Sequence, residues 1–163
     1  MKNIVILIAL AASVFGGEKE QRIIALTILG EARGEGTGGM YAVGCVIQER
    51  AREGNLTPAK VCHVPYQFSV WNAGKGKIKK ESELSDLWKS KSAPYARSLA
   101  FAIDSGFELV QEFTGNADHY YSKQIMKEPP YWAFKTIKKN GKEFKVEIKP
   151  TKIIGNHVFY NLR

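Results

Sequence analysis

The segment Glu20–Arg33, with the sequence EQRIIALTILGEAR, constrains the fold more than any other part of the chain. Its positions 23 to 29 are apolar or threonine, so a helix formed here has an apolar surface on nearly every side. Such a helix has to be surrounded by other parts of the protein. The segment therefore predicts a helix through the centre of a small domain, and the glycines at positions 34 and 36 indicate its end.

Two carboxylates, Glu31 and Glu35, follow the apolar run within the glycine-rich sequence GEARGE. Their spacing alone leaves two interpretations open: they pair with Arg33 or cap the next helix, or they lie at the edge of a binding cleft. Burial of a carboxyl group against apolar side chains raises its pKa. A general acid for glycosidic cleavage needs this property.

Three further helices are predicted, over residues 39–52, 57–62 and 92–104. Apolar residues recur at helical spacing in the longer two, and Thr57-Pro58 is a cap and first-turn signal for the short one. In residues 39–52 we expect a solvated side formed by Gln48, Glu49, Arg50 and Arg52. The polar segment 63–91 is predicted to be a long surface excursion that carries an aromatic motif.

The periodicity changes to that of strands in the last third of the chain. Residues 135–138 and 143–149 flank Asn140-Gly141, a pair that suits the type I′ turn of a hairpin. The lysines of this hairpin form either a solvated surface or a binding patch. A final strand is expected at His157–Tyr160. Residues 18–163 are thus predicted to form a single α+β domain, mainly helical with a small antiparallel hairpin or sheet.

Residues 1–17, MKNIVILIALAASVFGG, are typical of a secretory signal peptide. The apolar run is shorter than the roughly 20 residues that span a bilayer, which favours export over permanent membrane insertion; a buried N-terminal helix is the alternative. The chain has a formal net charge of +8. An exported basic protein is attracted to anionic polymers or membrane surfaces, which favours the acidic cell envelope over nucleic acid as its partner.

The only cysteines, Cys45 and Cys62, fit either one disulfide or two buried thiols. The chain has no CxxC or Cys/His finger spacing, so no structural zinc site or other cofactor is expected.

Polar residues able to do chemistry recur beside aromatic residues in the motifs QFSVW, DHYYS, PPYWA and GNHVFY. Sugar faces stack on aromatic rings and sugar hydroxyls pair with planar polar groups, so this mixture predicts a carbohydrate cleft. Each aromatic or histidine could instead belong to the core. The candidate substrate-binding residues are Glu35, Gln67, Ser69, Trp71, His119, Tyr120, Trp132 and His157.

In their order along residues 23–160, GEARGEGTGGMYAVGCVIQER, VCHVPYQFSVW, TGNADHYYS, PPYWA and IIGNHVFY resemble the catalytic domain of the SleB-like cell-wall hydrolases, the family of the spore-cortex-lytic enzymes. The resemblance implies a lysozyme-like fold and cleavage of peptidoglycan glycan strands by lytic transglycosylation, without a metal or cofactor. It implies Glu31 as the catalytic acid and Glu35 as a supporting residue. A monomer in the periplasm or outside the cell, associated with the wall, is expected.

Two of the motifs depart from the family pattern. Val70 replaces a cysteine that often precedes Trp71, which would leave Cys45 as the partner for any bridge to Cys62. NADHYY at 116–121 replaces the usual GATHYH, so His119 remains and the second histidine is lost.

Two other functions compete with this reading. One is a metal-dependent hydrolase that uses Glu31 or Glu35 with His119 and His157 as ligands, although no HExxH pair is present. The other is a non-catalytic wall-binding module that uses the basic hairpin.

Overall fold

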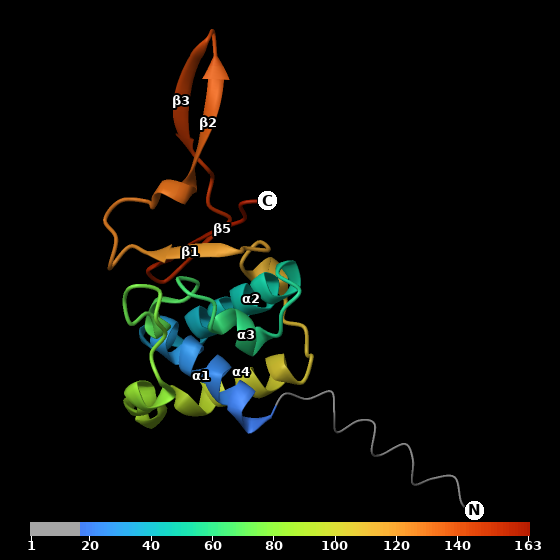
Figure 1. Ribbon diagram of the computed structural model, residues 1–163. Coiled ribbons are helices and arrows are strands. Elements are labelled where there is room, and N and C mark those ends of the chain that lie inside the picture. The colour runs from blue at the N-terminus through green and yellow to red at the C-terminus, as the bar shows by residue number, and fades with distance from the viewer. Residues whose placement is uncertain (1–16) are drawn as a thin grey trace, which may run out of the picture.

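The computed structural model describes residues 17–163, so nearly all of the predicted signal peptide lies outside the described residues. A layer of helices lies against a small sheet, and a two-stranded hairpin projects beyond that sheet (Figure 1). The α-helices of the described part are α1 (Glu18–Ala32), α2 (Gly36–Glu53), α3 (Pro58–Cys62) and α4 (Ala93–Asp104). Its strands are β1 (His119–Ser122), β2 (Phe134–Lys139), β3 (Lys142–Glu147), β4 (Lys152–Ile154) and β5 (His157–Tyr160).

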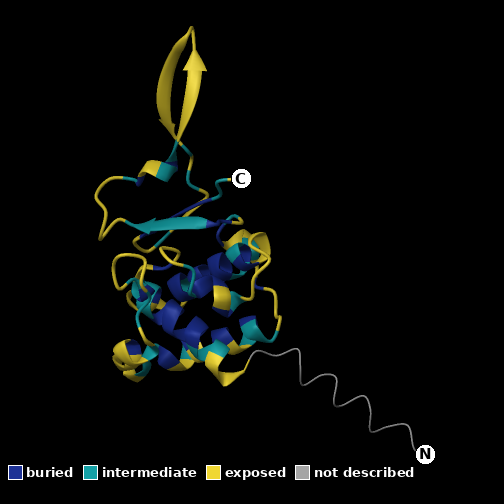
Figure 2. Ribbon diagram, in the orientation of Figure 1, coloured by how far each residue is buried: buried dark blue, intermediate teal, exposed yellow. Residues whose placement is uncertain are grey.

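Helix α1 runs through the core, as its sequence predicts. Residues 23–29 are all buried, and the helix packs against α2, α3 and α4 (Figure 2). Its buried polar residue, Thr27, donates its hydroxyl to the Ile23 carbonyl at 2.8 Å and accepts the indole N–H of Trp71 at 2.7 Å. Both hydrogen bonds satisfy a hydroxyl that would otherwise destabilise an apolar core.

The other predicted helices form close to their expected bounds. Helix α2 begins three residues earlier than predicted, at Gly36, whose φ of 70° lets the chain turn directly after a 3₁₀ helix at Arg33–Glu35. Thr57 caps α3 by accepting the Lys60 N–H at 3.3 Å. Ser92 precedes α4 but does not cap it, because its hydroxyl is directed to the Arg33 carbonyl at 3.4 Å.

Segment 63–91 is not the surface excursion that its polarity predicts. It contains 3₁₀ helices at Ser69–Trp71 and Glu81–Lys89. Three apolar side chains, those of Phe68, Trp71 and Leu84, enter the main core. Widely spaced apolar residues therefore hold a mostly polar segment against α1.

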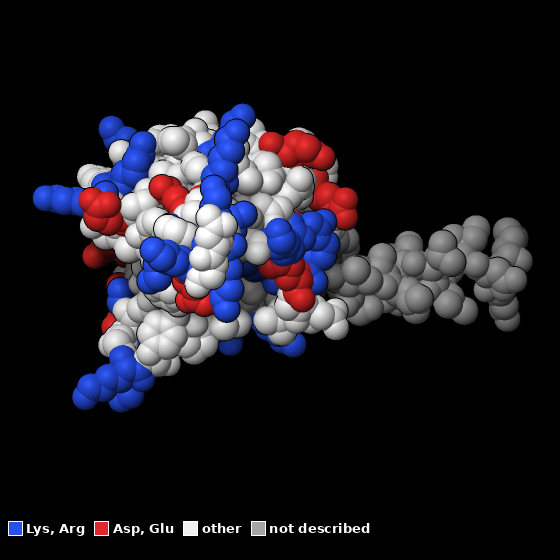
Figure 3. All heavy atoms as spheres, turned by 90° about the horizontal axis from the view of Figure 1, so that it is seen from above, with Lys and Arg blue, Asp and Glu red and all other residues white. Residues whose placement is uncertain are grey.

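The strands form two separate antiparallel units. One is a three-stranded sheet in the order β1-β5-β4, in which Tyr120 is opposite Phe159. The other is the β2–β3 hairpin, whose turn residues Asn140 and Gly141 have φ of 52° and 73°, as a type I′ turn requires. Lys and Arg side chains extend outward on several sides when the molecule is seen from above (Figure 3). A helical core with a small antiparallel sheet confirms the predicted α+β class and is consistent with a lysozyme-like fold.

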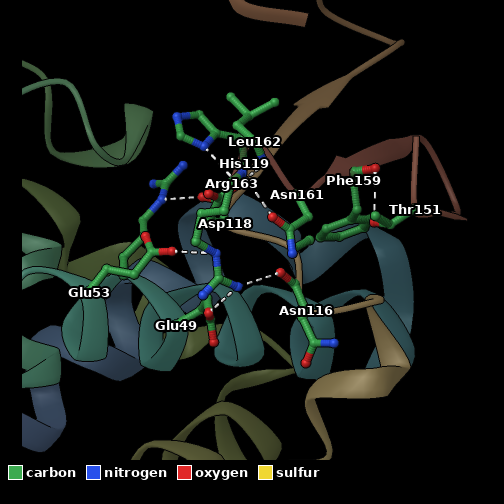
Figure 4. Close-up of polar contacts among 12 residues, drawn as sticks. Glu49, Glu53, Asn116, Asp118, His119, Thr151, Phe159, Asn161, Leu162 and Arg163 are labelled. Atoms are coloured by element: carbon green, nitrogen blue, oxygen red, sulfur yellow. Dashed lines mark hydrogen bonds and ion pairs between the residues drawn. The ribbon is translucent and has the colours of Figure 1, made fainter. Parts of the chain in front are cut away.

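The solvated side predicted for α2 is wrong at Glu49, which is 1% exposed. Its carboxylate forms ion pairs with Arg52 and with Arg163, which follows β5. Arg163 also pairs with Glu53 at 2.9 Å and donates to the Asn116 carbonyl at 3.2 Å (Figure 4). The end of the chain is thereby fastened to the last turns of α2.

Cys45 and Cys62 are free thiols, so the interpretation as two buried thiols is confirmed and no disulfide joins them. Burial raises the pKa of both thiols to about 12, which keeps them protonated and unreactive. Between residues 17 and 163, the structure contains no helix with both the length and the apolar character needed to cross a bilayer.

Candidate active site

Glu31 lies in the last turn of α1, where its carboxyl group meets three hydrogen-bond donors. Oε1 accepts from the Ser69 hydroxyl at 2.9 Å and from the Val70 N–H at 2.7 Å, and Oε2 accepts from the Tyr120 hydroxyl at 2.8 Å. Ser69 and Val70 belong to the 3₁₀ turn over Ser69–Trp71, whereas Tyr120 belongs to β1. The carboxyl group is therefore fixed between two walls that come from distant parts of the chain.

Gly30 allows the first of these walls to reach Glu31. A Cβ atom at position 30 would clash with the Val70 side chain, so only glycine lets the 3₁₀ turn pack this closely on α1. Trp71 holds the turn from the other side, since its ring is 2% exposed and its indole N–H binds Thr27. The structure thus places Trp71 beneath the site as an anchor and not on a surface where a sugar could stack.

The Glu31 carboxyl group opens into a cleft of about 520 Å³. Most of the predicted site residues line this cleft: Glu31, Glu35, Gln67, Ser69, Tyr120, Trp132 and His157. A larger hollow of about 810 Å³, bordered by residues of α1, α2 and α3, contains none of the predicted site residues. The smaller cleft is the candidate active site because it contains a carboxyl group held by three donors.

Two predicted site residues, Trp71 and His119, do not line the cleft. His119 lies close to it. Its Nδ1 lies 3.0 Å from Oδ1 of Asp118 (Figure 4). Its ring centroid is 5.1 Å from that of Trp132. Asp118 Oδ1 also accepts the N–H of Leu162 at 3.0 Å. His119 therefore packs behind Trp132, one of the cleft's aromatic walls, and links it to the end of the chain.

Glu35 is held differently from Glu31, although both lie in GEARGE. Its Oε2 accepts the Asn156 N–H at 2.8 Å and its Oε1 accepts the Asn156 side-chain amide at 3.1 Å. Gly155, with φ of 57°, makes room, because a Cβ there would clash with the Glu35 carboxylate. Burial raises the pKa of Glu35, but the Asn156 hydrogen bonds and the positive charge that His157 carries in acid outweigh it, so the net pKa lies below the usual 4.5.

His157 lies beside Tyr120 in the lining of the cleft. The His157 ring is 3% exposed and its centroid lies 5.0 Å from that of Tyr120. Burial lowers the pKa of His157 below 6.5, more than the carboxylates of Glu35 and Glu31 raise it, so this ring is neutral at neutral pH. Burial and the nearby Glu31 raise the pKa of Tyr120 well above 10, which keeps its hydroxyl protonated.

Arg50, which the helical periodicity assigns to the solvated side of α2, lines the cleft instead. Its Nε donates to the Asp118 carbonyl at 2.7 Å, and its Nη1 donates to the Gln67 carbonyl at 2.6 Å. The guanidinium also lies 4.9 Å from the centre of the Phe68 ring. Arg50 therefore joins the main chains leading to the two walls that hold Glu31, and the only sequence signal for it is its place in the motif GEARGEGTGGMYAVGCVIQER.

The rim of the cleft adds aromatic and apolar residues that sequence reasoning did not select. Tyr66, Tyr121, Ile125 and Met126 line it, and Tyr66 and Ile125 are 69% and 81% exposed. The loop after β1 has no regular period, so its position beside Glu31 could not be inferred from the sequence. With a carboxyl group at its base and rings at its rim, the cleft suits a carbohydrate chain.

The ligand set of the competing metal hypothesis is not brought together. Glu35 is bound to Asn156, and His119 is bound to Asp118 outside the cleft. Within the described residues, no three His, Cys, Asp or Glu side chains are grouped so that they could hold a metal ion.

Comparison with protein families relates this chain to a known family. The model of the Cell Wall Hydrolase family matches residues 34–160, which include both cleft walls and Glu35 and begin just after Glu31. Comparisons with curated proteins and with solved structures give no match. Because the family model covers most of the chain, this protein belongs to the cell wall hydrolase family.

Proposed function

We propose that this cell-wall hydrolase is a lytic transglycosylase that cleaves the β-1,4 bond between N-acetylmuramic acid and N-acetylglucosamine in peptidoglycan. The proposal rests on the Glu31 carboxyl group, which is held by Ser69, Val70 and Tyr120 at the base of an aromatic cleft. One carboxyl group serves first as general acid and then as general base. The glycan strand lies along the cleft, with Trp132 and Tyr66 as surfaces for sugar rings.

The partners of Glu31 favour one of its oxygens as the proton carrier. Oε1 faces the Val70 N–H, which can only donate, whereas Oε2 faces the Tyr120 hydroxyl, which can donate or accept. The proton of the acid form therefore belongs on Oε2. From there it passes to the glycosidic oxygen as the bond to C1 of the muramoyl residue breaks, and the N-acetylglucosamine side leaves as an alcohol.

The second step returns the proton to Glu31. The carboxylate takes it from the 6-hydroxyl of the muramoyl residue while that oxygen bonds to C1, which closes a 1,6-anhydro ring and consumes no water. The donors from Ser69, Val70 and Tyr120 stabilise the carboxylate between the two steps.

Glu35 supports this arrangement and is not the nucleophile. A retaining glycosidase needs a second free carboxylate about 5 to 5.5 Å from the acid. Both oxygens of Glu35 are already bound by Asn156, and the carboxylate fastens the segment after α1 to the β4–β5 turn. We also propose that the protein is exported by residues 1–17 and acts as a monomer on peptidoglycan outside the cytoplasmic membrane.

Digestion of purified peptidoglycan, followed by mass spectrometry of the soluble products, tests the proposal. The wild-type protein is expected to release fragments with anhydromuramoyl ends, and Glu31→Gln to release them about 10² to 10⁴ times more slowly because the acid is lost. Activity is expected to persist in a chelator, which would inactivate a metal hydrolase.

Several results would contradict the proposal. Undiminished release by a folded Glu31→Gln variant would remove Glu31 from the chemistry, and muramoyl products with ordinary reducing ends would show hydrolysis by water. Wall binding without any soluble product would support the non-catalytic module instead. Thermal unfolding of the variant separates lost catalysis from lost folding.

A further inference from the structure

The β2–β3 hairpin forms a sheet of its own and projects away from the rest of the molecule (Figure 1). It is exposed along nearly its whole length (Figure 2). Of the hydrophobic residues near it, Phe134 and Ile148 at its base pack on a small core cluster. The outer hairpin is thus free to contact something outside the chain.

The register of the hairpin divides its side chains between two faces, because residues directly opposite each other share a face. One face, here called the basic-apolar face, has three exposed apolar side chains: Ile137, Phe144 and Val146 are 39%, 47% and 38% exposed. Lysines lie around them in the same register. The pairs of this face are Lys135 with Val146, Ile137 with Phe144, and Lys139 with Lys142.

The charge of the hairpin is also unevenly distributed. Residues 134–149 contain six lysines and two glutamates, and both glutamates belong to the opposite face. There, Glu143 pairs with Lys138 at 3.2 Å and Glu147 accepts the Tyr160 hydroxyl at 3.0 Å. The basic-apolar face therefore combines positive charge with an apolar centre and has no carboxylate of its own.

We propose that the basic-apolar face docks onto a membrane surface rich in anionic phospholipids. The negative potential of such a surface attracts lysines. Burial of apolar side chains at the boundary between headgroups and acyl chains adds to the binding free energy. An anionic wall polymer would attract the lysines equally, but it offers nothing in which Ile137, Phe144 and Val146 can be buried. The exposed apolar centre therefore favours the lipid surface.

Docking would also position the cleft. Trp132, which lines the cleft, lies two residues before β2, and Phe134 at the start of β2 packs against the same small core cluster as Trp132. A hairpin held on the membrane would keep the cleft close to the membrane. This interaction is independent of the chemistry proposed for Glu31, so either can fail without the other.

Binding of the full chain to vesicles tests the proposal, with phosphatidylcholine alone compared with phosphatidylcholine containing phosphatidylglycerol. Each lysine near an anionic surface contributes roughly fivefold to the partition coefficient. The triple variant Lys135→Gln, Lys139→Gln, Lys142→Gln is therefore expected to bind the anionic vesicles about a hundredfold more weakly. The matched control, Lys75→Gln, Lys77→Gln, Lys91→Gln, has the same net charge but an intact hairpin, and should bind like the wild type.

A fluorescent probe reports which face makes contact, because both native thiols are buried and an introduced cysteine can be labelled selectively. A nitrobenzoxadiazole group on Val146→Cys, in the basic-apolar face, should shift to the blue with anionic vesicles, whereas one on Thr136→Cys, in the opposite face, should not. Equal loss of binding in the two triple variants, or a shift at Thr136 instead of Val146, would overturn the proposal. So would binding to purified teichoic acid with no binding to vesicles.

Discussion

Glu31 and Glu35 are four residues apart in one motif, yet the fold gives them different partners. Glu31 is held by two hydroxyls and one N–H inside the cleft, whereas Glu35 is bound at both oxygens by Asn156. A hydroxyl can follow the proton of a carboxyl group as it leaves and returns, and an N–H cannot. The hydrogen-bond partners, more than the spacing, are therefore what assign the proposed reacting role to Glu31 and the proposed structural role to Glu35.

Tyr120→Phe tests the role of the hydroxyl at Oε2 of Glu31. Removing it leaves the proposed proton-carrying oxygen without its hydrogen bond. We expect kcat to fall roughly 10- to 100-fold with a small change in KM, since the hydroxyl acts on Glu31 and not on the sugar. Tyr95→Phe, on α4 and outside the lining of the cleft, is the control and should retain most activity. A Tyr120→Phe enzyme with normal kcat would contradict the assignment of Oε2.

Glu35→Gln tests the structural role of the second carboxylate through its pH dependence. The folded-state pKa of Glu35 is lowered, so its stabilising effect is fully present above the unfolded value near 4.5 and is lost as the pH falls through the folded pKa. At pH 7 the variant should be less stable by about 1 kcal/mol, as expected for a weakened hydrogen-bonding carboxylate. Denaturant unfolding at a series of pH values should show the two proteins converging in acid. If the free energies of unfolding of the two proteins differed by the same amount at all pH values, ionisation of Glu35 would not contribute to stability.

The long elements could be predicted from the sequence because their signals are local. The apolar run of α1, the turn pair Asn140-Gly141 and the strand His157–Tyr160 all occur where they are expected. Strands β1 and β4 could not be predicted in the same way, because each is short and pairs with β5, which is distant in sequence from β1. The packing of segment 63–91 could not be predicted from its polarity, because burial of Phe68 and Trp71 depends on contact with α1.

Gly30→Ala tests whether position 30 of α1 must lack a side chain for the 3₁₀ turn to reach Glu31. In an ordinary helix this change is stabilising by roughly 0.5 to 1 kcal/mol, but here the new methyl group would clash with Val70. We expect lower thermal stability and a loss of activity greater than that of Ser69→Ala, because both donors of the turn are displaced. Gly34→Ala is the matched control, since a Cβ there meets no atom within 4 Å. Equal behaviour of the two variants would disprove the close-packing role.

In the molecule as a whole, the site is assembled from segments that only the tertiary structure brings together. Residue type selected Ser69 and Tyr120 as candidates from aromatic and polar motifs, and the family resemblance singled out Glu31 from the two carboxylates of GEARGE. All three line the cleft. Type alone could not distinguish Trp71, which is buried, from Trp132, which lines the cleft. Helical periodicity also could not show that the Arg50 side chain lines the cleft and binds two main-chain carbonyls.

Arg50 is where this assembly can be tested, because it connects α2 to both walls of the cleft. Its two short hydrogen bonds go to the carbonyls of Gln67 and Asp118, and a lysine in its place keeps the charge but cannot span both. We expect Arg50→Lys to lower kcat by roughly 10- to 100-fold, since small displacements of catalytic groups have effects of this size. KM should change little, because Arg50 acts through main-chain atoms.

The same substitution at Arg52, two residues further along α2, is the matched control. Arg52 pairs with Glu49 and does not line the cleft, so Arg52→Lys should leave kcat unchanged while the unfolding midpoint reports any loss of stability. If both variants lost activity only in proportion to stability, Arg50 would be one structural arginine among several. If kcat fell in Arg50→Lys alone, at an unfolding midpoint equal to that of the control, positioning of the two walls would be what this residue contributes.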